Sequence, residues 1–247
     1  MIVDEIRRKA LKIIDEDFEV LDFSLALPYT YVLIKGEKGK SLGVAMTLRE
    51  EIKDYKSEFD DISVESFIKG VNSLNVVERT IGLATVNAIS QYYLNPNKIT
   101  ESDVVEILSK DLKRVAVVGN MIPVVKALKN RGYEVYVFER NPSLHDENTL
   151  SDSFEYRLLP EMDAVLISGT ALINDTIDLI LERSKKARLK VLVGATAQVL
   201  PEFFKNVLTH IASIRILDVE KVLLSLKLGS AAKLFDSRFS RKYVVRV

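Results

Sequence analysis

The sequence contains no cysteine and no tryptophan, and only two of its 247 residues are histidine. Without cysteine the protein has no disulfide, thiolate nucleophile, iron–sulfur cluster or cysteine-based zinc site. The two histidines, His145 and His210, leave little for an imidazole-rich metal site. Any chemistry must therefore rest mainly on carboxylate, hydroxyl, amide and cationic side chains.

An excess of charge of either sign is also absent, because 35 Lys and Arg residues balance 35 Asp and Glu residues. This balance gives no electrostatic reason to expect binding to nucleic acid or to an anionic membrane. No apolar run reaches the roughly 18 residues of a membrane span, and the first residues lack a signal-type apolar stretch. We expect a cytoplasmic protein whose partners are neither nucleic acids nor membranes.

Glycine and proline are sparse, with 10 and 6 residues, while 47 % of the chain is apolar and 28 % is charged. This composition excludes collagen-like, linker-like and disordered chains and is typical of a folded globular protein. A length of 247 residues predicts one large or two small domains.

The first part of the chain has a mixed pattern. Apolar residues at helical spacing predict a helix over residues 2–14. Segments rich in β-forming residues and a glycine turn then predict a strand meander, and further helices follow it. The expected strands cover residues 18–23, 31–34 and 41–46, and the expected helices begin near Ser63 and cover 76–93. This order predicts an α+β domain.

A boundary follows the last of these helices. Pro96 disfavours helical geometry in the residue before it, so the helix should end there. The segment from Thr100 to Asp103 resembles a capping box for a connecting helix that would reach Leu112. We therefore predict two domains, at residues 1–99 and 100–247.

The second part alternates apolar strands with helical segments. Such continuous apolar strands indicate a parallel sheet that helices cover on both faces. The expected strands are 115–119, 135–139, 164–169, 191–194 and 213–217, and the expected helices lie near 122–131, 174–187, 201–209 and 218–228. The predicted fold class is α/β.

In such a sheet, ligands bind at the carboxyl ends of the strands, so the loops there are the candidate site. The first loop, Gly119-Asn120-Met-Ile-Pro123, lacks the glycine spacing of a dinucleotide site. Glu139 ends the next strand about 20 residues later, which is where an acidic residue can bind a ribose hydroxyl. A solvated loop carboxylate is an equally good interpretation of Glu139.

The loop over 168–176 follows the third strand and carries Gly169, Thr170, Asn174 and Thr176. Hydroxyls and free amides at a helix that starts at 174 or 175 would form an anion site, and simple capping of that helix is compatible with this role. Thr196 follows the fourth strand in a similar setting. The recurrence of glycine with Asn or Thr favours one shared polar pocket.

The helix over 76–93 carries further candidates. Glu78 and Gly82 lie four residues apart and share a face, and Asn87 lies in an apolar stretch, where it needs a partner. A glycine inside a helix costs about 1 kcal/mol, and tight helix packing is the favoured reason for it. Glu78 is the candidate acid or base and Arg79 the candidate group for an anionic ligand, although a solvated face explains both.

Two histidine segments carry less weight. His145-Asp146-Glu147 is the one His–carboxylate cluster in the sequence, but metal ligands normally converge from separate segments. His210 is expected to cap a helix end at the surface.

Several of these motifs together resemble a prokaryotic family described as putative heavy-metal chelation proteins. The helix Glu78-Arg79-Thr-Ile-Gly82-Leu-Ala-Thr-Val-Asn87-Ala88 is similar to the family pattern ERxxGxAxxNA. Other matching segments are 117–123, Glu139-Arg-Asn141-Pro142, 163–176 and 194–201. The sequence departs from the pattern at Ser168, at Ala195-Thr196 and at Asp175, which stands where glycine is common.

The resemblance implies an enolase N-terminal-like α+β domain followed by a Rossmann-like α/β domain, with a site in the cleft between them. It adds Asn141 to the ligand-binding candidates, which are Gly119, Asn120, Glu139, Asn141, Gly169, Thr170, Asn174, Thr176 and Thr196. It also implies a metal ion or a metal chelate as the ligand, with the metal-binding residues unknown.

Three functions remain open from the sequence. The first is binding of a heavy metal or, since the chain offers no thiolate, of a metal already held by an organic chelator. The second is an enzyme that acts on a small anionic or nucleotide-like substrate in the same cleft. The third is a non-catalytic interaction protein, and a homo-oligomer is compatible with each of them.

Overall fold

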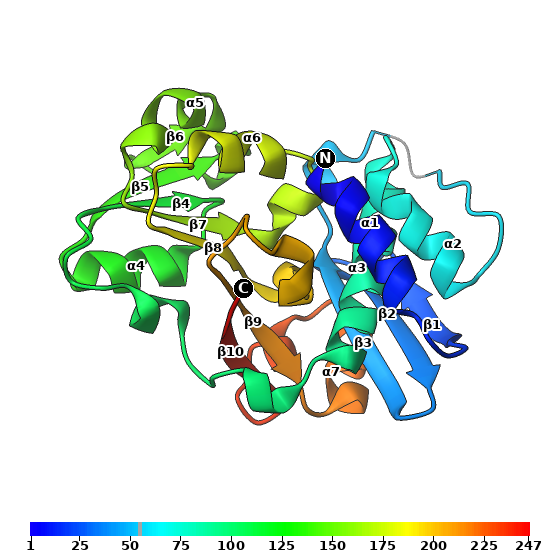
Figure 1. Cartoon of the computed structure of the whole chain (residues 1–247). Coiled ribbons are helices and arrows are strands. Elements are labelled where there is room, and N and C mark those ends of the chain that lie inside the picture. Colours follow the sequence, from blue (N-terminus) through cyan, green and yellow to red (C-terminus); the bar gives the residue numbers. More distant parts are fainter. Residues whose placement is uncertain (54–55) are drawn as a thin grey trace.

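Two β-sheets form the framework of the molecule (Figure 1). The computed structural model describes residues 1–53 and 56–247. An antiparallel three-stranded sheet has the order β1-β2-β3, and a mostly parallel seven-stranded sheet has the order β10-β9-β8-β7-β4-β5-β6. The chain is thus an α/β protein, and residues of the first sheet all precede those of the second.

The first sheet consists of β1 (Glu19–Ser24), β2 (Tyr29–Gly36) and β3 (Gly39–Met46). Helices α1 (Ile2–Ile13), α2 (Val64–Lys69) and α3 (Val76–Tyr93) accompany it. The side chains of Ser63 and Asn75 cap α2 and α3 by accepting backbone N–H groups. Most of α3 is buried, and it packs against β2 and β3.

Two glycines allow α3 to pack this closely. A β-carbon on Gly43 of β3 would lie 2.1 Å from the carbonyl oxygen of Ala84. A β-carbon on Gly82 would lie 2.6 Å from the backbone nitrogen of Val71. The predicted reason for the glycine inside the helix, tight packing, is confirmed.

The second sheet contains strands of small and branched apolar residues, and its central parallel strands are buried on both faces. Val115 and Val117 of β4 pack with Leu128 of α4 on one face, whereas Ala116 and Val118 face the opposite side. The strands are β4 (Arg114–Val118), β5 (Glu134–Glu139), β6 (Thr149–Ser151), β7 (Ala164–Ser168), β8 (Leu189–Val193), β9 (His210–Ile216) and the antiparallel β10 (Ser240–Arg246). The helices are α4 (Ile122–Asn130), α5 (Glu155–Leu158), α6 (Ile177–Arg183) and α7 (Val219–Lys227).

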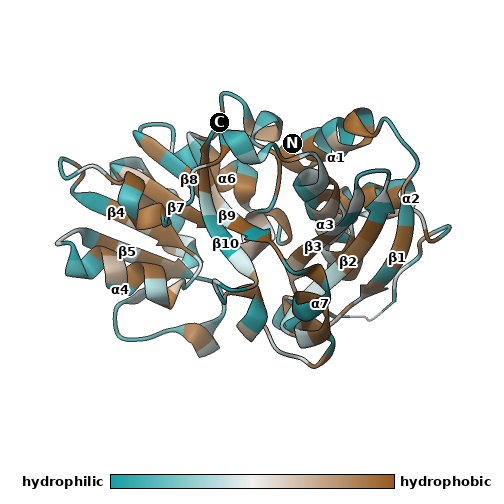
Figure 2. Cartoon of the chain, turned by 90° about the horizontal axis from the view of Figure 1, so that it is seen from below, coloured by the Kyte–Doolittle hydropathy of each residue, from teal (hydrophilic) through white to brown (hydrophobic). Residues whose placement is uncertain are grey.

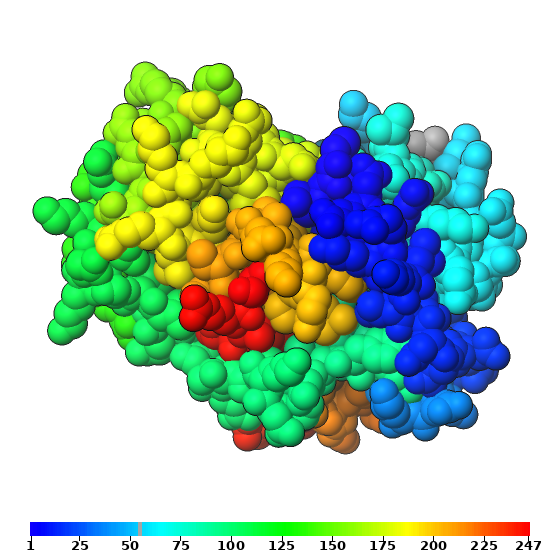
Figure 3. All heavy atoms as spheres, viewed as in Figure 1, coloured from blue at the N-terminus to red at the C-terminus, as the bar shows by residue number. Residues whose placement is uncertain are grey.

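The two sheets share their hydrophobic packing. One continuous core contains Ile6 and Phe67 from the first part and Val165 and Phe204 from the second, and hydrophobic stretches occur on strands of both sheets (Figure 2). In Figure 3 the N-terminal helix lies directly beside the segment around residues 200–208. The two parts of the chain therefore share their main core, while a second cluster, around Val115 and Leu128, belongs to the second part alone.

Helix α7 adds to the packing between the two parts of the chain, because it covers the remaining face of the three-stranded sheet. Its residues Val222 and Leu226 pack with Leu33 and Val44 of β2 and β3. Two ion pairs flank the contact, Lys40 with Glu220 at 2.6 Å and Lys227 with Asp22 at 2.5 Å.

Side chains take the place of a fourth strand along the free edge of β3. The N–H of Val44 donates to Gln198 at 3.0 Å, and the N–H of Met46 donates to the hydroxyl of Thr196 at 3.0 Å. The amide of Asn87 donates to the carbonyl oxygens of Val44, at 2.7 Å, and Thr196, at 2.9 Å. Asn87 is fully buried and thus joins α3, β3 and the loop after β8.

Most of the predicted elements agree with the structure. The three helices of the first part, its three strands and the turn between 36 and 39 are confirmed, as are the five predicted strands and the helices near 122–131 and 218–228. Strands β6 and β10 and the short helix α5 were not predicted. No helix in the described part of the chain is long and apolar enough to cross a membrane.

The predicted connecting helix from Thr100 to Leu112 is wrong. Thr100 is held in a β-bridge with Val244, with N–O distances of 2.9 and 2.8 Å, so its backbone is extended. Asp103 instead caps a single 3₁₀ turn, Val104–Ile107, by accepting the N–H of Val105.

Two further predicted helices differ from the structure. The segment after β7 forms a 3₁₀ turn, Gly169–Leu172, and Asp175 then adopts a left-handed conformation with φ of 61°. Helix α6 therefore begins only at Ile177. The helix predicted near 201–209 is wrong: the chain forms only the 3₁₀ turn Pro201–Phe204. Lys205 has already left helical geometry with ψ of 131°, and Asn206 is left-handed with φ of 66°.

Candidate functional site

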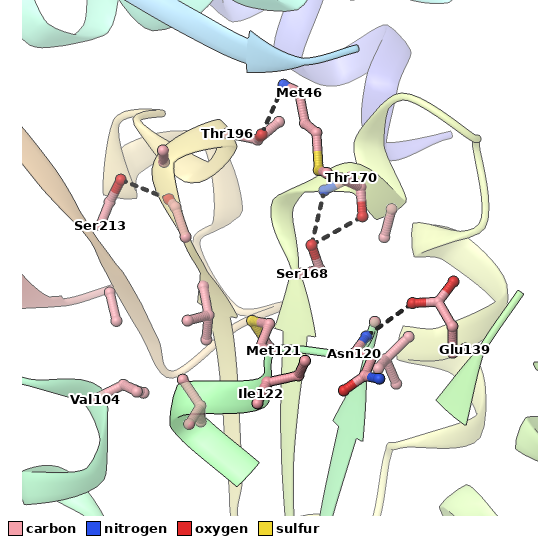
Figure 4. Close-up of a pocket in the computed structure, with 18 of the residues that line it drawn as sticks. Met46, Val104, Asn120, Met121, Ile122, Glu139, Ser168, Thr170, Thr196 and Ser213 are labelled. Carbon is pink, nitrogen blue, oxygen red and sulfur yellow. Dashed lines mark hydrogen bonds between the residues drawn. The ribbon is translucent and has the colours of Figure 1, made fainter. Parts of the chain in front are cut away.

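A cavity of about 520 Å³ lies at the carboxyl ends of β4, β5, β7 and β8. This is the edge at which the strand order reverses around β4, which has β5 on one side and β7 on the other. Tyr29 and Met46 of the first sheet and Leu48 contribute to the opposite wall. The cavity therefore lies between the two sheets, and Figure 4 shows Met46 projecting toward the loops that follow the parallel strands.

Gly119 makes the first of these turns possible. It follows β4 with φ of 90°, a conformation that other residues rarely adopt. A β-carbon at this position would also lie 2.8 Å from the β-carbon of Ser168. The close contact between these two loops thus requires glycine, for both conformational and steric reasons.

Glu139 at the end of β5 organises two loops. One carboxylate oxygen accepts the backbone N–H of Asn120 at 2.8 Å, and the other accepts that of Asn141 at 2.8 Å. The amide of Asn120 donates to the carbonyl oxygen of Leu144 at 2.7 Å. The carboxylate still borders the cavity (Figure 4), so its remaining lone pairs can accept hydrogen bonds from a ligand.

A group of hydroxyl and amide side chains follows β7. The Ser168 hydroxyl oxygen accepts the hydroxyl of Thr170 at 2.8 Å, and Asn174 Oδ1 accepts the hydroxyl of Thr176 at 2.8 Å. All four residues line the cavity. The Asn174 amide nitrogen has no hydrogen-bond partner among the described residues and is available as a donor.

Apolar groups make up most of the surface of the cavity wall. They come from both sheets and from the start of α4, and they include Met46, Val118, Met121, Ile122, Phe138, Ile214 and Phe235. Ile122 and Phe235 are about half exposed, which places apolar surface where the cavity meets solvent. Such a lining suits the body of an organic molecule.

Carboxylates outnumber cations around the cavity. Six acidic residues line it, namely Glu50, Glu51, Asp103, Glu139, Asp152 and Glu155, against the two cations Arg140 and Lys242. Both cations are already in ion pairs, Arg140 with Asp152 at 2.9 Å and Glu51 at 3.4 Å, and Lys242 with Asp103 at 2.7 Å. Although burial opposes it, the Lys242 ammonium holds the pKa of Asp103 below its usual value.

Glu155 differs from the other five carboxylates. It is only 5 % exposed, yet it lines the cavity, and it makes no hydrogen bond or ion pair through its side chain with any described residue. Burial raises the pKa of Glu155 to about 7, the negative charges of Asp152 and Glu139 add to this, and Arg140 opposes it.

Residues 7–90 and 103–245 match two adjacent family models, DUF4213 and DUF364, which share the description "Putative heavy-metal chelation". The chain belongs to this putative heavy-metal chelation family. An uncharacterized protein of Methanocaldococcus jannaschii is 52 % identical over 256 residues, which cover 100 % of this chain and 98 % of the relative.

Solved structures of the family show the same fold. A DUF364 protein of unknown function from Pyrococcus horikoshii is 47 % identical, with a TM-score of 0.95 and full coverage of both chains. A second one, from Desulfitobacterium hafniense, is 20 % identical, with a TM-score of 0.76 over 99 % of this chain and 98 % of its own. The second similarity concerns the fold alone.

The structure brings together most of the ligand-binding candidates that the strand-end loops and the family motifs suggested. Seven of them line the cavity: Gly119, Asn120, Glu139, Thr170, Asn174, Thr176 and Thr196. Asn141 and Gly169 are outside its lining. Asn141 donates its N–H to Glu139, and a β-carbon on Gly169 would lie 2.7 Å from the backbone nitrogen of Ala197, so both shape the loops instead.

The two catalytic candidates lie elsewhere. Glu78 and Arg79 are in the first turn of α3 and do not line the cavity. The Glu78 carboxylate accepts the backbone N–H of Glu58 at 2.9 Å, and Arg79 Nε is buried without a hydrogen-bond partner among the described residues. In this part of the family motif, Asn87 is the residue that reaches the loops of the cavity, through Thr196.

Sequence reasoning missed Asp152 and Glu155. Both follow β6, a three-residue strand that was not predicted, and so both lie at the same carboxyl edge as the other loops. A prediction of β6 would have drawn attention to them. The burial of Glu155 has no local signal, because its neighbours Phe154 and Tyr156 are exposed.

The side chains do not fit a bare heavy-metal ion. No group of three or more His, Asp or Glu residues within the described ranges is arranged to hold a metal. His145 Nε2 hydrogen-bonds the carbonyl oxygen of Glu139 at 2.8 Å, and His210 belongs to β9, where burial lowers its pKa. Soft metals prefer thiolates and imidazoles, which the cavity does not supply.

Proposed function

We propose that this protein binds a small organic molecule in the cavity between its two sheets, and that a metal enters only as part of an organic chelate. The ligand would have a largely apolar body and a polar end. Free heavy-metal ions are not the ligand in this proposal, because the donor groups that such ions prefer do not converge there in the described part of the chain.

One observation carries the proposal, namely the combination of volume and lining. A cavity of about 520 Å³ lies within the range typical of small-molecule sites, which are mostly apolar with a few polar groups. Here the apolar wall comes from both sheets, while Asn120, Glu139 and Thr170 place polar groups just after the ends of the strands (Figure 4). Asn174 adds a further polar group to the cavity wall.

A second candidate function is an enzyme that acts on a nucleoside-like substrate. The strand order is that of Rossmann-like sheets, in which an acidic residue at the end of the second strand binds ribose hydroxyls, and Glu139 occupies that position. A phosphate group would find few backbone N–H donors in the first loop. The N–H of Asn120 already donates to Glu139, and Pro123 has no N–H.

A thermal-shift panel on metal-stripped protein tests the proposal. The probes are zinc chloride, adenosine, AMP, S-adenosylmethionine, 8-hydroxyquinoline and its zinc complex. A ligand that binds the folded state at 100 times its Kd adds about 2.7 kcal/mol of stability, which gives a measurable shift. We expect shifts with the organic probes or the zinc complex and none with zinc chloride.

A pair of variants locates the site. Ile122→Trp places a bulky ring on a half-exposed residue of the cavity wall, and Leu224→Trp makes a similar change on the exposed side of α7, outside that wall. The organic shifts should disappear in the first variant and persist in the second. A shift with zinc chloride alone, or organic shifts that Ile122→Trp leaves unchanged, would overturn the proposal.

A further inference from the structure

One end of the cavity is unusual because a buried carboxylate there has no partner among the described residues. Glu155 is the first residue of α5, directly after the 3₁₀ turn Asp152–Phe154 that follows β6. Its side chain is 95 % buried, lines the cavity and makes no hydrogen bond or ion pair with any described residue. Buried carboxylates are normally paired, so an unpaired one that faces a cavity needs an explanation.

The neighbouring charges do not supply the missing partner. The Arg140 guanidinium is the nearby cation, but it is committed to Asp152 and Glu51. The carboxylate of Glu139 already accepts two backbone N–H groups and offers no positive charge. Glu155 therefore lies beside two other acidic groups, in an environment that favours an added positive charge.

We propose that Glu155 binds the protonated nitrogen of an amine-bearing ligand, with the apolar body of that ligand lying against the wall formed by both sheets. This inference rests on the proposed small-molecule function and names the class of ligand. An ammonium group has three donors and needs no fixed coordination geometry, so one carboxylate with neighbouring acceptors can hold it.

The alternatives fit the same observations less well. A metal ion would need three or more converging donors, which the described residues do not provide. An anionic end group would meet three carboxylates at this end of the cavity, namely those of Glu139, Asp152 and Glu155, with the one nearby guanidinium already paired. A neutral ligand would leave Glu155 buried without a partner.

Three ligands of one shape test the inference. Tryptamine, tryptophol and indole-3-acetate share an indole ring and a two-carbon chain, and they carry a positive, a neutral and a negative end. Their affinities would be measured by titration calorimetry at about pH 8, where an alkyl amine is still protonated. A hydrogen bond between two charged groups should favour tryptamine over tryptophol by about tenfold or more.

Matched variants assign the preference to one side chain. Glu155→Gln keeps the shape and removes the charge, and it should abolish the preference for tryptamine. Glu65→Gln is the control, because Glu65 also lies in the first turn of a helix but is exposed and outside the cavity wall. The preference should be unchanged in the control.

The outcomes separate this inference from the proposed function. Equal affinities for the three ligands, or a preference that survives Glu155→Gln, would overturn the inference. If Ile122→Trp still blocked these ligands, the cavity would remain a small-molecule site. Failure of all three ligands to bind at millimolar concentration counts against the amine assignment. The thermal-shift panel described above then decides, independently, whether the cavity binds small molecules. Zinc binding that Glu155→Gln abolishes would replace the amine by a metal.

Discussion

Glu155→Gln should make the folded protein more stable at neutral and alkaline pH. The pKa of this carboxyl rises from an ordinary value of 4.5 to about 7 on folding. A difference of about 2.5 pKa units corresponds to about 3 kcal/mol, because one unit is 1.36 kcal/mol. Glu155 is almost fully buried, so solvent screening does not reduce this figure much. The wild-type protein carries this cost when the carboxyl is ionised.

The direction of the pH dependence follows from the raised pKa. The folded state holds the Glu155 proton more tightly than the unfolded state does. The cost is therefore absent below about pH 4.5, grows as the pH rises to about 7, and is complete above that. The glutamine side chain of the variant cannot ionise. The variant should thus equal the wild type near pH 4.5 and exceed its stability by about 3 kcal/mol near pH 8.

Urea unfolding at these two pH values measures the effect. In thermal unfolding of a chain of this length, a stability difference of about 3 kcal/mol corresponds to a shift of roughly 6–12 °C in Tm. Glu65→Gln, on the exposed side of α2, should change stability by less than about 0.5 kcal/mol at either pH. A gain of equal size at both pH values, or a loss near pH 8, would refute the assignment of a buried, unpartnered and ionisable carboxyl.

Three other predictions follow from the loops around the cavity. Asn87→Ala should cost about 2–4 kcal/mol in urea unfolding, because it leaves two buried carbonyl groups without a donor; a cost below about 1 kcal/mol would show that the amide is replaceable. Gly119→Ala should cost about 1 kcal/mol more than Gly132→Ala. Both glycines have positive φ, but only the first would meet another side chain, that of Ser168, and equal costs would contradict this. Asn174→Ala should weaken binding of the organic probes while changing stability by less than about 1 kcal/mol, and the reverse pattern would make Asn174 purely structural.

Local patterns in the sequence predicted the fold well where local forces determine it. The helix over 76–93 was predicted with its bounds because it is long, free of proline and capped by a polar residue. The buried parallel strands were visible as apolar runs. Strand β10 was not, since its sequence Ser-Arg-Lys-Tyr-Val-Val-Arg is rich in charge and pairs with β9 at the edge of the sheet.

The predicted helices that failed did so because of long-range or conformational effects. Thr100 has the residue type and spacing of a helix cap, but a bridge to Val244, far along the chain, keeps it extended. Asp175 and Asn206 adopt left-handed conformations within the segments predicted as helices, where a continuous helix cannot include them, and neither residue type announces this by itself. The left-handed Asp175 also explains why glycine is common at that position in the family pattern.

The loops that form the site were predictable because parallel strands align their carboxyl ends. Gly119, Glu139 and Asn174 were found by this rule alone. Glu78 and Arg79 were chosen for their chemistry within a motif, and the structure places them in the first turn of α3, whereas Asn87 lies more than two turns further along that helix. The division of the chain at residues 99 and 100 remains a prediction, and helix α7 packs across it onto the first sheet.

The capped edge of β3 has a consequence for how fast ligands can enter and leave. Proteins with a ligand cleft between two domains commonly open by a hinge motion. At high ligand concentration the rate of that motion then limits the rate of association. Here hydrogen bonds of Asn87, Thr196 and Gln198 link β3 to the loop that follows β8 of the second sheet. The main hydrophobic core also includes residues of both parts. We expect exchange to depend on small side-chain movements near Ile122, so observed association rates should rise linearly with ligand concentration and show no plateau.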